Sequence, residues 1–405
     1  MDVPDERTME RLLRRGVAEI IVQSEFVELL KMGRPLRLKM GFDPSAPDIH
    51  LGHAVGLRKL RQLQELGHTV VLIVGDWTAR IGDPSGRSAT RPMLTAEQVR
   101  ENAETYLAQF FKIVDRDRAE TRWQSEWFGD FTLTDVINLT SKFTVAQLLA
   151  REDFAKRFKA NQPIAITELL YPLLQAYDSV AIESDVEFGG TDQRFNLLVG
   201  RDLQEMRGQK PQQCFLMPLL PGTDGVQKMS KSLGNYIGID EPANDIYGKT
   251  MSLPDSMIIP YFDYLTDLPD GELSEMRSAL EAGSVNPIEF KKRLAADLVT
   301  QFHDAPSAIS AAEYFELTVQ RSQVPEDIPV FVLPALDELK GKRLSRLLQD
   351  AGLVTSISEA RRLILQGAVQ INGHVVKSDD GADTLDLKAN DVIRAGRRRY
   401  VRLVR

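Results

Sequence analysis

Two histidines lie three residues apart in the string His50-Leu51-Gly52-His53, at the predicted start of a helix, in a chain with only five histidines. This spacing places both imidazoles on one face of the first turn, beside free backbone N–H groups and the positive end of the helix dipole. Such a site suits a polyphosphate. Gly52 would let a nucleotide lie against the backbone, because a side chain would fill that space. The alternative is two polar residues that only cap a helix.

A second candidate is the string Lys228-Met229-Ser230-Lys231-Ser232, which has glycines on both sides. Two lysines three residues apart on a mobile loop can close over phosphates. They can also neutralise the charge that develops as pyrophosphate leaves. The alternative is a solvated surface loop.

Three polar residues, Tyr171, Gln175 and Asp178, share one face of a predicted helix, because their spacings are four and three. The rest of that face is apolar and should meet the core, where unpaired polar groups are costly. A ligand with an amine and a hydroxyl would supply their partners. A hydrogen-bond network internal to the protein is the alternative.

The elements that position these residues can be predicted from the pattern around them. Alternating apolar residues predict a strand over 36–42, a turn at 43–48, a helix over about 50–66 and a buried strand over 69–75. A strand–helix–strand unit of this length implies a parallel sheet with its ligand crevice at the carboxyl ends of the strands. Residues 43–53 should therefore form the first active-site loop.

The same pattern recurs later in the chain, with strands predicted over 186–188 and 214–220 and a helix over 192–206 between them. Further helices are predicted over 95–111 and 167–177. A repeated unit of this kind is typical of doubly wound α/β sheets.

Beyond residue 242 the pattern changes. Residues 242–317 are predicted to be helical, and prolines then mark a linker. The last part of the chain should contain two short helices and two strand pairs, at 344–351, 358–366, 369–376 and 392–404.

The net charge of −8 is unevenly distributed along the chain. Residues 341–405 contain 13 Lys or Arg against 7 Asp or Glu, a net charge of +6, whereas the first 340 residues have a net charge of −14. A basic module on an acidic body indicates that the last part of the chain contacts phosphates. The alternative is a solvated charged tail.

Composition narrows the class of protein. The chain has 405 residues, of which 43% are hydrophobic and 27% charged, as expected for a soluble protein of two or three domains. Its longest apolar stretch, Val70 to Val74, is far shorter than a bilayer span, and its first residues are acidic, so we expect no membrane association and a cytoplasmic location. The single cysteine, Cys214, is expected to be a buried thiol.

The histidine and lysine strings together resemble the signature pair of class I aminoacyl-tRNA synthetases, in the order and beside the strands that this family requires. The resemblance covers essentially the whole chain. It implies that ATP activates an amino acid to an aminoacyl-adenylate and that the acyl group is transferred to the 3′ end of a tRNA. His50, His53, Lys228 and Lys231 would be the catalytic residues.

The resemblance also implies a domain organisation. Residues 1–235 would form a Rossmann-type α/β catalytic domain, with an inserted dimer-interface region at about 120–165. An α-helical anticodon-arm domain would follow at 236–325, then a linker at 326–340. Residues 341–405 would form a small α+β S4-type RNA-binding domain, with Arg346, Arg361 and Arg362 facing RNA.

The helix that contains Tyr171, Gln175 and Asp178 is similar to the substrate helix of tyrosyl-tRNA synthetases. In that family the tyrosine and the glutamine hold the α-amino group of the substrate, and the aspartate meets its phenolic hydroxyl. The resemblance extends to further substrate-binding positions, which are Asp83 at the ammonium group, Thr78 in the same pocket and Gln193 near the reacting carboxylate. The ATP-binding positions that it implies are Gly41, Asp43, Ser45, Gly52, Arg87, Arg91, Gly190, Asp192, Met229 and Ser230.

One position departs from the better-known pattern, in which a second phenol-binding tyrosine lies four residues before Asp43. Lys39 occupies that position. An ammonium group cannot both donate and accept as a phenol does, so Asp178 is expected to carry most of the phenol recognition. The chain is similar to a separate bacterial branch of the family that also lacks this tyrosine.

Three other functions are compatible with part of this pattern. A tryptophanyl-tRNA synthetase shares both signature strings, but Gln175, Asp178 and the S4-like tail argue against it. The others are a catalytically silent RNA-binding paralogue and a ligase that joins small molecules without RNA. The expected partners are tRNA(Tyr), L-tyrosine and ATP, with Mg²⁺ carried by ATP rather than held at a permanent metal site. The resemblance also implies a homodimer.

Overall fold

The computed structural model describes residues 3–44, 48–83, 94–320, 328–334, 339, 341–381, 385, 387–396 and 399–404. The chain divides into two compact units. One consists of Met1–Glu241 and Ser252–Leu294, and the other of Pro242–Met251 and Ala295–Arg405.

The first unit is an α/β structure. Its strands are β1 (Glu19–Ile20), β2 (Arg37–Phe42), β3 (Thr69–Val74), β4 (Ala119–Trp123), β5 (Val186–Gly190) and β6 (Gln213–Met217). Its helices of four or more residues are α1 (Glu6–Arg14), α2 (Gln23–Lys31), α3 (Leu51–Glu65), α4 (Thr78–Ile81), α5 (Ala96–Phe110), α6 (Ser125–Phe128), α7 (Leu133–Thr140), α8 (Val145–Leu148), α9 (Glu152–Lys159), α10 (Ile166–Ala181), α11 (Arg194–Met206), α13 (Ile258–Leu265), α14 (Asp270–Glu281) and the first residues of α15 (Pro287–Phe302). Short 3₁₀ helices lie at η1 (Arg116–Arg118), η2 (Thr191–Gln193), η3 (Lys231–Leu233) and η4 (Asp255–Met257).

Within the described residues, the strands of this unit form one sheet in the order β1-β6-β5-β2-β3-β4. Every neighbouring pair is parallel except β1 with β6. The chain runs outward from β2 through β3 to β4 on one side, and from β5 to β6 on the other. The predicted strand–helix–strand units and the doubly wound sheet are therefore confirmed, with a switch point between β2 and β5.

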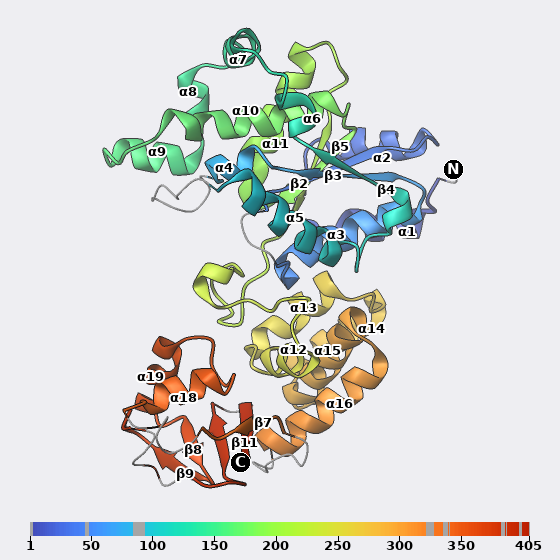
Figure 1. Cartoon of the computed structure of the whole chain (residues 1–405). Helices are drawn as coiled ribbons and strands as arrows, with labels where there is room; N and C mark the ends of the chain where they lie inside the picture. Colours follow the sequence, from blue (N-terminus) through green and yellow to red (C-terminus); the bar gives the residue numbers. More distant parts are fainter. Residues whose placement is uncertain are drawn as a thin grey trace. The chain divides into compact units, whose positions relative to one another are not determined.

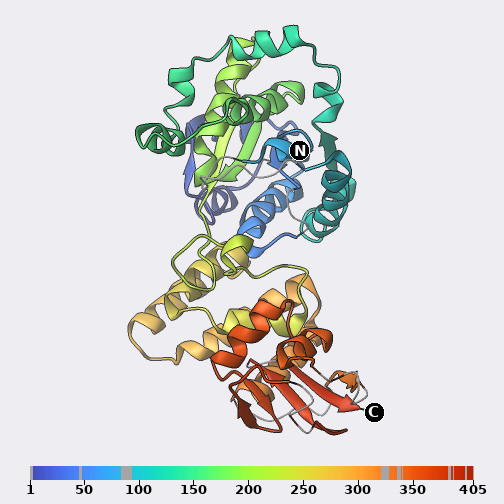
Figure 2. The ribbon, with the colours of Figure 1, turned by 60° about the vertical axis from the view of Figure 1, so that its left-hand side comes forward.

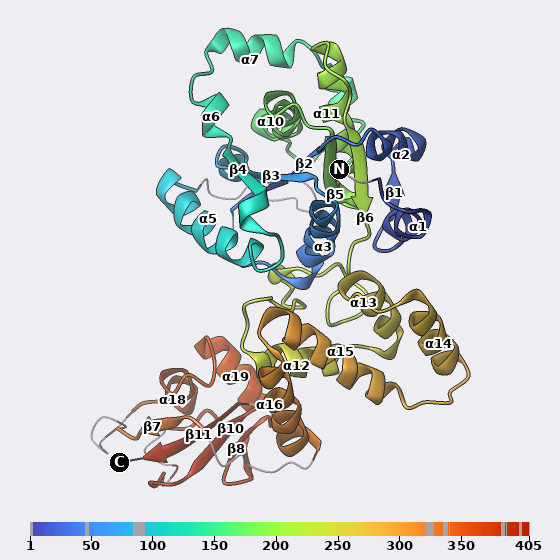
Figure 3. The ribbon, with the colours of Figure 1, turned by 90° about the vertical axis from the view of Figure 1, so that its right-hand side faces the viewer.

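Helices cover both faces of this sheet. α10 and α11 lie on one face, and α3 and α5 on the other (Figures 1 and 3). Apolar strand residues such as Leu38 and Val71 are fully buried between these layers. The short helices α6 to α9 follow one another around the α10 side of the unit, drawn in teal to green in Figure 2.

Two strands of the sheet were not predicted from the sequence. β1 has only two residues, too few for a periodic signal. β4 has the sequence Ala-Glu-Thr-Arg-Trp, and all five of its residues are partly exposed because it is an edge strand. The helix predicted over 167–177 is longer in the structure and extends to Ala181.

The second unit is helical and then mixed. Helices are present over the predicted range 242–317, but they are divided between the two units. Its elements are α12 (Ala243–Met251), the last residues of α15 (Pro287–Phe302), α16 (Ala305–Phe315), η5 (Glu316–Gln320), β7 (Val330–Val332), α18 (Leu344–Asp350), α19 (Ile357–Leu365), β8 (Val369–Ile371), β9 (His374–Val376), β10 (Val392–Ala395) and β11 (Arg399–Val404). Among the described residues the strands form a sheet in the order β7-β11-β10-β8-β9. α18 and α19 pack on it through buried residues that include Leu347, Ile364 and Ile393.

The strand β7 lies inside the range predicted to be a linker. It pairs in parallel with β11, with Val332 opposite Val404. Proline is tolerated beside an edge strand, and the carbonyl of Pro329 accepts a hydrogen bond from the Arg402 amide at 2.8 Å. The prolines therefore bound a short strand here. The domain boundaries proposed from the sequence stay predictions.

Two expectations from the composition can be compared with the structure. Cys214 is buried in β6, as predicted, and burial raises the pKa of its thiol to about 12. In the part of the chain that the structure describes, no helix is both long enough and apolar enough to span a bilayer.

Candidate active site

A cavity of about 990 Å³ lies at the carboxyl ends of the parallel strands of the first unit. Every described catalytic, substrate-binding and ATP-binding residue predicted from the sequence lines it, namely Gly41, Asp43, His50, Gly52, His53, Thr78, Asp83, Tyr171, Gln175, Asp178, Gly190, Asp192, Gln193, Lys228, Met229, Ser230 and Lys231. Ser45, Arg87 and Arg91 lie outside the described residues. The predicted RNA-binding residues Arg346, Arg361 and Arg362 belong to the second unit.

The two histidines cap α3 with their own rings. His50 is the N-cap residue, and its Nδ1 accepts a hydrogen bond from the Gly52 amide at 3.2 Å, while Nδ1 of His53 accepts one from the His50 amide at 3.3 Å. Because both Nδ1 atoms accept, each neutral ring carries its proton on Nε2. An added Cβ at Gly52 would lie 3.0 Å from the His50 ring. Glycine at this position therefore also leaves room for the cap.

Burial keeps both rings neutral near pH 7. It lowers the pKa of His53 to about 4, and the ammonium groups of Lys231 and Lys228 add to the effect. The pKa of His50 lies well below its ordinary value, first because of burial and then because of His53 and the two lysines. Each ring can thus donate an Nε2–H hydrogen bond without exchanging a proton.

The two signature lysines pair with carboxylates at the cavity. Lys228 Nζ lies 2.9 Å from Asp192 Oδ2, and Lys231 Nζ lies 3.3 Å from Asp48 Oδ2. Asn235 holds the loop around them, because its Oδ1 accepts a hydrogen bond from the Ser230 amide at 2.8 Å. The loop thus presents two cations in contact with groups that line, or lie beside, the predicted nucleotide site.

The polar face of α10 is directed at the cavity. The hydroxyl of Tyr171 donates to Asp43 Oδ2 at 2.8 Å. Asp178 accepts hydrogen bonds from Gln124 Nε2 at 2.9 Å and from Trp127 Nε1 at 3.2 Å. These side chains therefore have partners within the chain, as the internal-network alternative required, and they line the cavity as well.

Asp178 is an unusual carboxyl group, because it is almost fully buried. Burial raises its pKa to about 7, while the charge of Lys39 and the hydrogen bond from Gln124 act in the opposite direction. Near neutrality this group can therefore change its charge in response to a ligand that donates a hydrogen bond.

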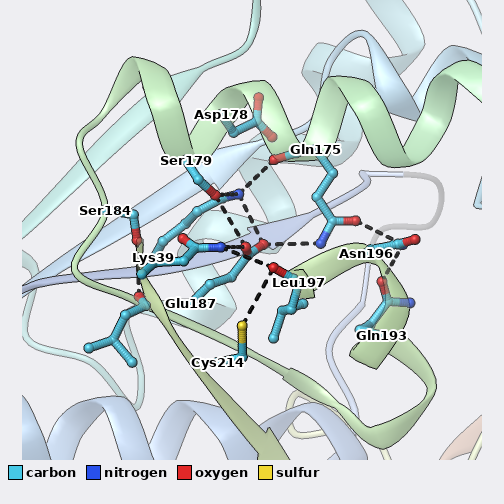
Figure 4. A network of polar contacts seen from close by, with 12 residues as sticks. Lys39, Gln175, Asp178, Ser179, Ser184, Glu187, Gln193, Asn196, Leu197 and Cys214 are labelled. Atoms are coloured by element: carbon cyan, nitrogen blue, oxygen red, sulfur yellow. Dashed lines mark hydrogen bonds and ion pairs between the residues drawn. The ribbon is translucent and has the colours of Figure 1, made fainter. Parts of the chain in front are cut away.

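Lys39 is directed away from the cavity. Its Nζ donates to the Gln175 carbonyl and to Ser179 Oγ, each at 2.7 Å, and forms an ion pair with Glu187 at 2.9 Å (Figure 4). The sequence placed Lys39 where a phenol-binding tyrosine is usual. In the structure its ammonium group lies beneath α10, where it contacts Gln175, Ser179 and Glu187.

Sequence reasoning missed several residues at this site. Gln124 lines the cavity and follows directly after β4, so it could have been found if that strand had been recognised. Arg151 is buried, and its guanidinium lies 3.3 Å from Asp83 and 3.1 Å from Asn196. Asn196 in turn donates to Gln175 and to Gln193. No local pattern marks these long-range partners.

Known proteins are similar to this chain in sequence and in fold. Residues 31–320 match the family described as tRNA synthetases class I (W and Y), and residues 342–380 match the S4 domain. A tyrosine–tRNA ligase of Dehalococcoides mccartyi is 59% identical over 98% of this chain and 99% of its own length. The chain belongs to the tyrosine–tRNA ligase family. A second family member, from Thermotoga maritima, is 50% identical over 99% of this chain and 98% of its own.

Solved structures of tyrosyl-tRNA synthetases have the same fold. The Archaeoglobus fulgidus protein, complexed with L-tyrosine, superposes with a TM-score of 0.62 at 24% identity, over 75% of this chain and 99% of that one. The Aeropyrum pernix protein gives a TM-score of 0.60 at 22% identity, over 77% and 98%. The fold class predicted from the sequence, with a Rossmann-type sheet, a helical region and an S4 domain, is confirmed for this member of the tyrosine–tRNA ligase family.

The capping contact of His50, together with its expected role as a hydrogen-bond donor to the phosphates, generates a prediction. Asparagine is a good N-cap residue but has no Nε2–H donor, so His50→Asn should keep the thermal midpoint close to that of the wild type. It should lower the rate of tyrosine-dependent pyrophosphate exchange about 100-fold, the usual effect of losing one donor to a transition state. His50→Ala should lower both, because it also removes the cap. Equal loss of stability in the two variants would contradict this division of roles.

Proposed function

We propose that this chain activates L-tyrosine with ATP to tyrosyl-adenylate and pyrophosphate, and then transfers the tyrosyl group to the 3′ end of tRNA(Tyr). The observation that carries the proposal is a buried carboxylate, Asp178, in the same cavity as the two Nε2–H donors of the histidine pair and the two loop lysines. Sequence identities of 59% and 50% to two tyrosine–tRNA ligases, over nearly the full length of the chains, support it.

The polar groups of α10 suit tyrosine. Tyr171, Gln175 and Asp83 would hold the ammonium group, with Thr78 and Gln193 completing that end of the pocket. Asp178 would accept the hydrogen bond from the phenolic hydroxyl. Phenylalanine would be disfavoured, because the buried Asp178 would lose the hydrogen bond from the phenol and would retain those from Gln124 and Trp127. This family is the known example of selection by such an acceptor.

The reaction needs positioned charge rather than a covalent intermediate. A carboxylate oxygen of tyrosine would attack the α-phosphorus of ATP, and the bond from that phosphorus to the bridging oxygen would break as pyrophosphate leaves. His50 and His53 would donate hydrogen bonds to the phosphates, and Lys228 and Lys231 would neutralise the developing charge. A terminal hydroxyl of the tRNA would then attack the adenylate carbonyl and release AMP.

The remaining residues of the cavity would bind the nucleotide. Asp192 is proposed to hold the ribose. The other proposed contacts are Gly41, Asp43, Gly52, Gly190, Met229 and Ser230, together with Ser45, Arg87 and Arg91 outside the described part of the chain. Magnesium would enter with ATP, as the counter-ion of its phosphates.

We also propose a homodimer formed through the region at about 120–165. Support comes from its large exposed apolar side chains, among them Leu133 at 75%, Val145 at 61% and Phe158 at 62% exposure, because soluble monomers seldom gather so many.

The inferred place of this reaction is the cytoplasm. The branch of the family that lacks the first-strand tyrosine is proposed from Lys39 alone.

The S4 domain and the helical region before it would bind the tRNA. Arg346, Arg361 and Arg362 lie on α18 and α19, and the first two side chains are 56% and 54% exposed while also contacting Asp350 and Asp379. Exposed arginines on short helices are suited to the phosphate backbone of RNA. We propose that this surface contacts an arm of the tRNA.

The activity is tested by amino-acid-dependent exchange of pyrophosphate into ATP, with tyrosine, tryptophan and phenylalanine compared under identical conditions. Exchange with tyrosine alone is expected. Exchange driven by tryptophan alone would overturn the assignment of the substrate, and no exchange with any of the three would favour the catalytically silent alternative.

The raised pKa of Asp178 predicts how tyrosine binding depends on pH. The ionised carboxyl accepts a hydrogen bond from the phenol, and its population rises as the pH increases through about 7. The affinity for tyrosine, measured by calorimetry, should therefore increase about tenfold between pH 6 and pH 8. In Asp178→Asn the affinity should be weaker and independent of pH in this window. Wild-type affinity that falls over the same range would contradict the role of Asp178.

Loss of positive charge on the S4 domain should weaken the binding of tRNA without changing the activation of tyrosine. The triple variant Arg346→Gln, Arg361→Gln, Arg362→Gln is expected to raise the KM for tRNA about tenfold and to make it less dependent on salt, because fewer phosphates are neutralised. Its pyrophosphate exchange should equal that of the wild type. An unchanged KM and salt dependence would show that the tRNA is bound elsewhere.

A further inference from the structure

The switch point of the catalytic sheet contains a buried ion pair. Lys39 on β2 and Glu187 on β5 are directly opposite each other in the register of the two parallel strands. Their side chains are 0% and 1% exposed, and Nζ of the lysine lies 2.9 Å from Oε1 of the glutamate. Both side chains face α10, the helix that carries the proposed substrate groups (Figure 4).

The hydrogen bonds around this pair leave it little freedom. Lys39 has three N–H donors, and these are matched by the Gln175 carbonyl, Ser179 Oγ and Glu187 Oε1. Glu187 also accepts from Gln175 Nε2 at 3.1 Å, from Ser179 Oγ at 3.2 Å and from Gln212 Nε2. The pair thus contacts both the backbone and the side chain of Gln175.

This arrangement determines which way the Gln175 carboxamide points. An ionised carboxylate can only accept hydrogen bonds, so Gln175 must present its Nε2 to Glu187. Its Oε1 is then directed to the other side, where it accepts from Asn196 Nδ2 at 3.0 Å. Gln175 lines the cavity. The carboxamide oxygen is the atom that an ammonium group of a ligand requires.

We propose that Lys39 and Glu187 are positioning residues that fix the carboxamide of Gln175 with its oxygen available to the ammonium group of the amino acid. This inference rests on the proposed function, because it assigns Gln175 to that group. Lys39 would thus influence the binding of the substrate indirectly, through Gln175 on α10, without contacting the phenol.

A role in stability alone explains the pair less well. A buried ion pair is weak support for stability, because desolvation of the two charges offsets much of their attraction, and apolar residues often pack equally well. Arg37, two residues away on β2, provides a comparison, because its pair with Glu120 at 2.8 Å is partly exposed and its Nε donates to the Ile182 carbonyl, at the C-terminal cap of α10, at 2.7 Å. The same strand therefore has one cation that contacts Gln175 and one that contacts the far end of α10.

The contacts of Asn196 extend the effect to the other proposed ammonium-binding groups. Asn196 Nδ2 also donates to Gln193 Oε1 at 2.9 Å, and Gln193 Nε2 donates to Asp83 Oδ2 at 2.8 Å. The pair is therefore connected through Gln175 to Asp83 by hydrogen bonds alone. A change at Glu187 should be felt at the ammonium end of the substrate.

The test compares Lys39→Met, Glu187→Gln and the double variant with Arg37→Met as a matched control. Both single variants should raise the KM for tyrosine about tenfold, because the carboxamide can then turn and the ammonium loses an acceptor. The KM for ATP should change less than about twofold. In Glu187→Gln, inhibition by 3-(4-hydroxyphenyl)propanoate, which is tyrosine without its amino group, should be equally unaffected. This readout is used for Glu187→Gln rather than Lys39→Met, because the charge of Lys39 also lowers the pKa of Asp178, the proposed acceptor of the phenol. In the double variant the effect should be smaller than the product of the two single effects, because both act through one contact.

Thermal unfolding separates positioning from folding. If Lys39→Met fails to fold, Glu187→Gln, which is close to the natural residue in shape, and the double variant decide the question. A tyrosine KM no higher than that of Arg37→Met would overturn the inference, as would equal weakening of the deaminated analogue in Glu187→Gln. Absence of tyrosine-dependent exchange in the wild type would instead overturn the proposed function.

Discussion

The catalytic unit depends on one constraint, the divergence of the chain on either side of β2 and β5. The connection that follows β2 runs to one side of the sheet and the connection that follows β5 to the other, so their carboxyl ends leave a crevice that neither connection covers. The loops that follow the strands then enclose this crevice, and each brings one kind of group: the histidine pair after β2, Thr78 after β3, Gln124 after β4 and Asp192 after β5.

Side chains at the switch point fall into two layers. In the cavity lie the groups proposed to contact substrates, and beneath α10 lie the residues that hold them. Glu187 is buried in the lower layer, and Gln175 extends between the two. Because buried polar groups need partners, the amide and carboxyl groups of this region fix one another, and the shape of the site follows from that mutual satisfaction as much as from the backbone.

Much of this organisation could be predicted from the sequence. The parallel strands β2, β3, β5 and β6 are apolar enough to be recognised, and a strand followed by a helix places the histidine pair at a crevice without further information. β4 was not predicted, because an edge strand contains few apolar residues. Lys39 illustrates the limit of prediction from the sequence. The alternation of residues along β2 indicates the face of the sheet on which Lys39 lies. Its partner Glu187 could not be predicted, because the pairing depends on the register of β2 with a strand that is distant in the sequence. The same holds for Arg151, which approaches Asp83 only through the tertiary fold.

The contact between Lys228 and Asp192 has a consequence for how the site could accept a nucleotide. The two side chains are 45% and 27% exposed, and an ion pair of this exposure contributes about 1 kcal/mol or less. In the roles proposed for these residues, the lysine would exchange a carboxylate for a phosphate at little cost, and its departure would leave Asp192 able to accept from a sugar hydroxyl. Entry of one ligand would then release two protein groups at once, which couples recognition of the ribose to recruitment of the loop cation.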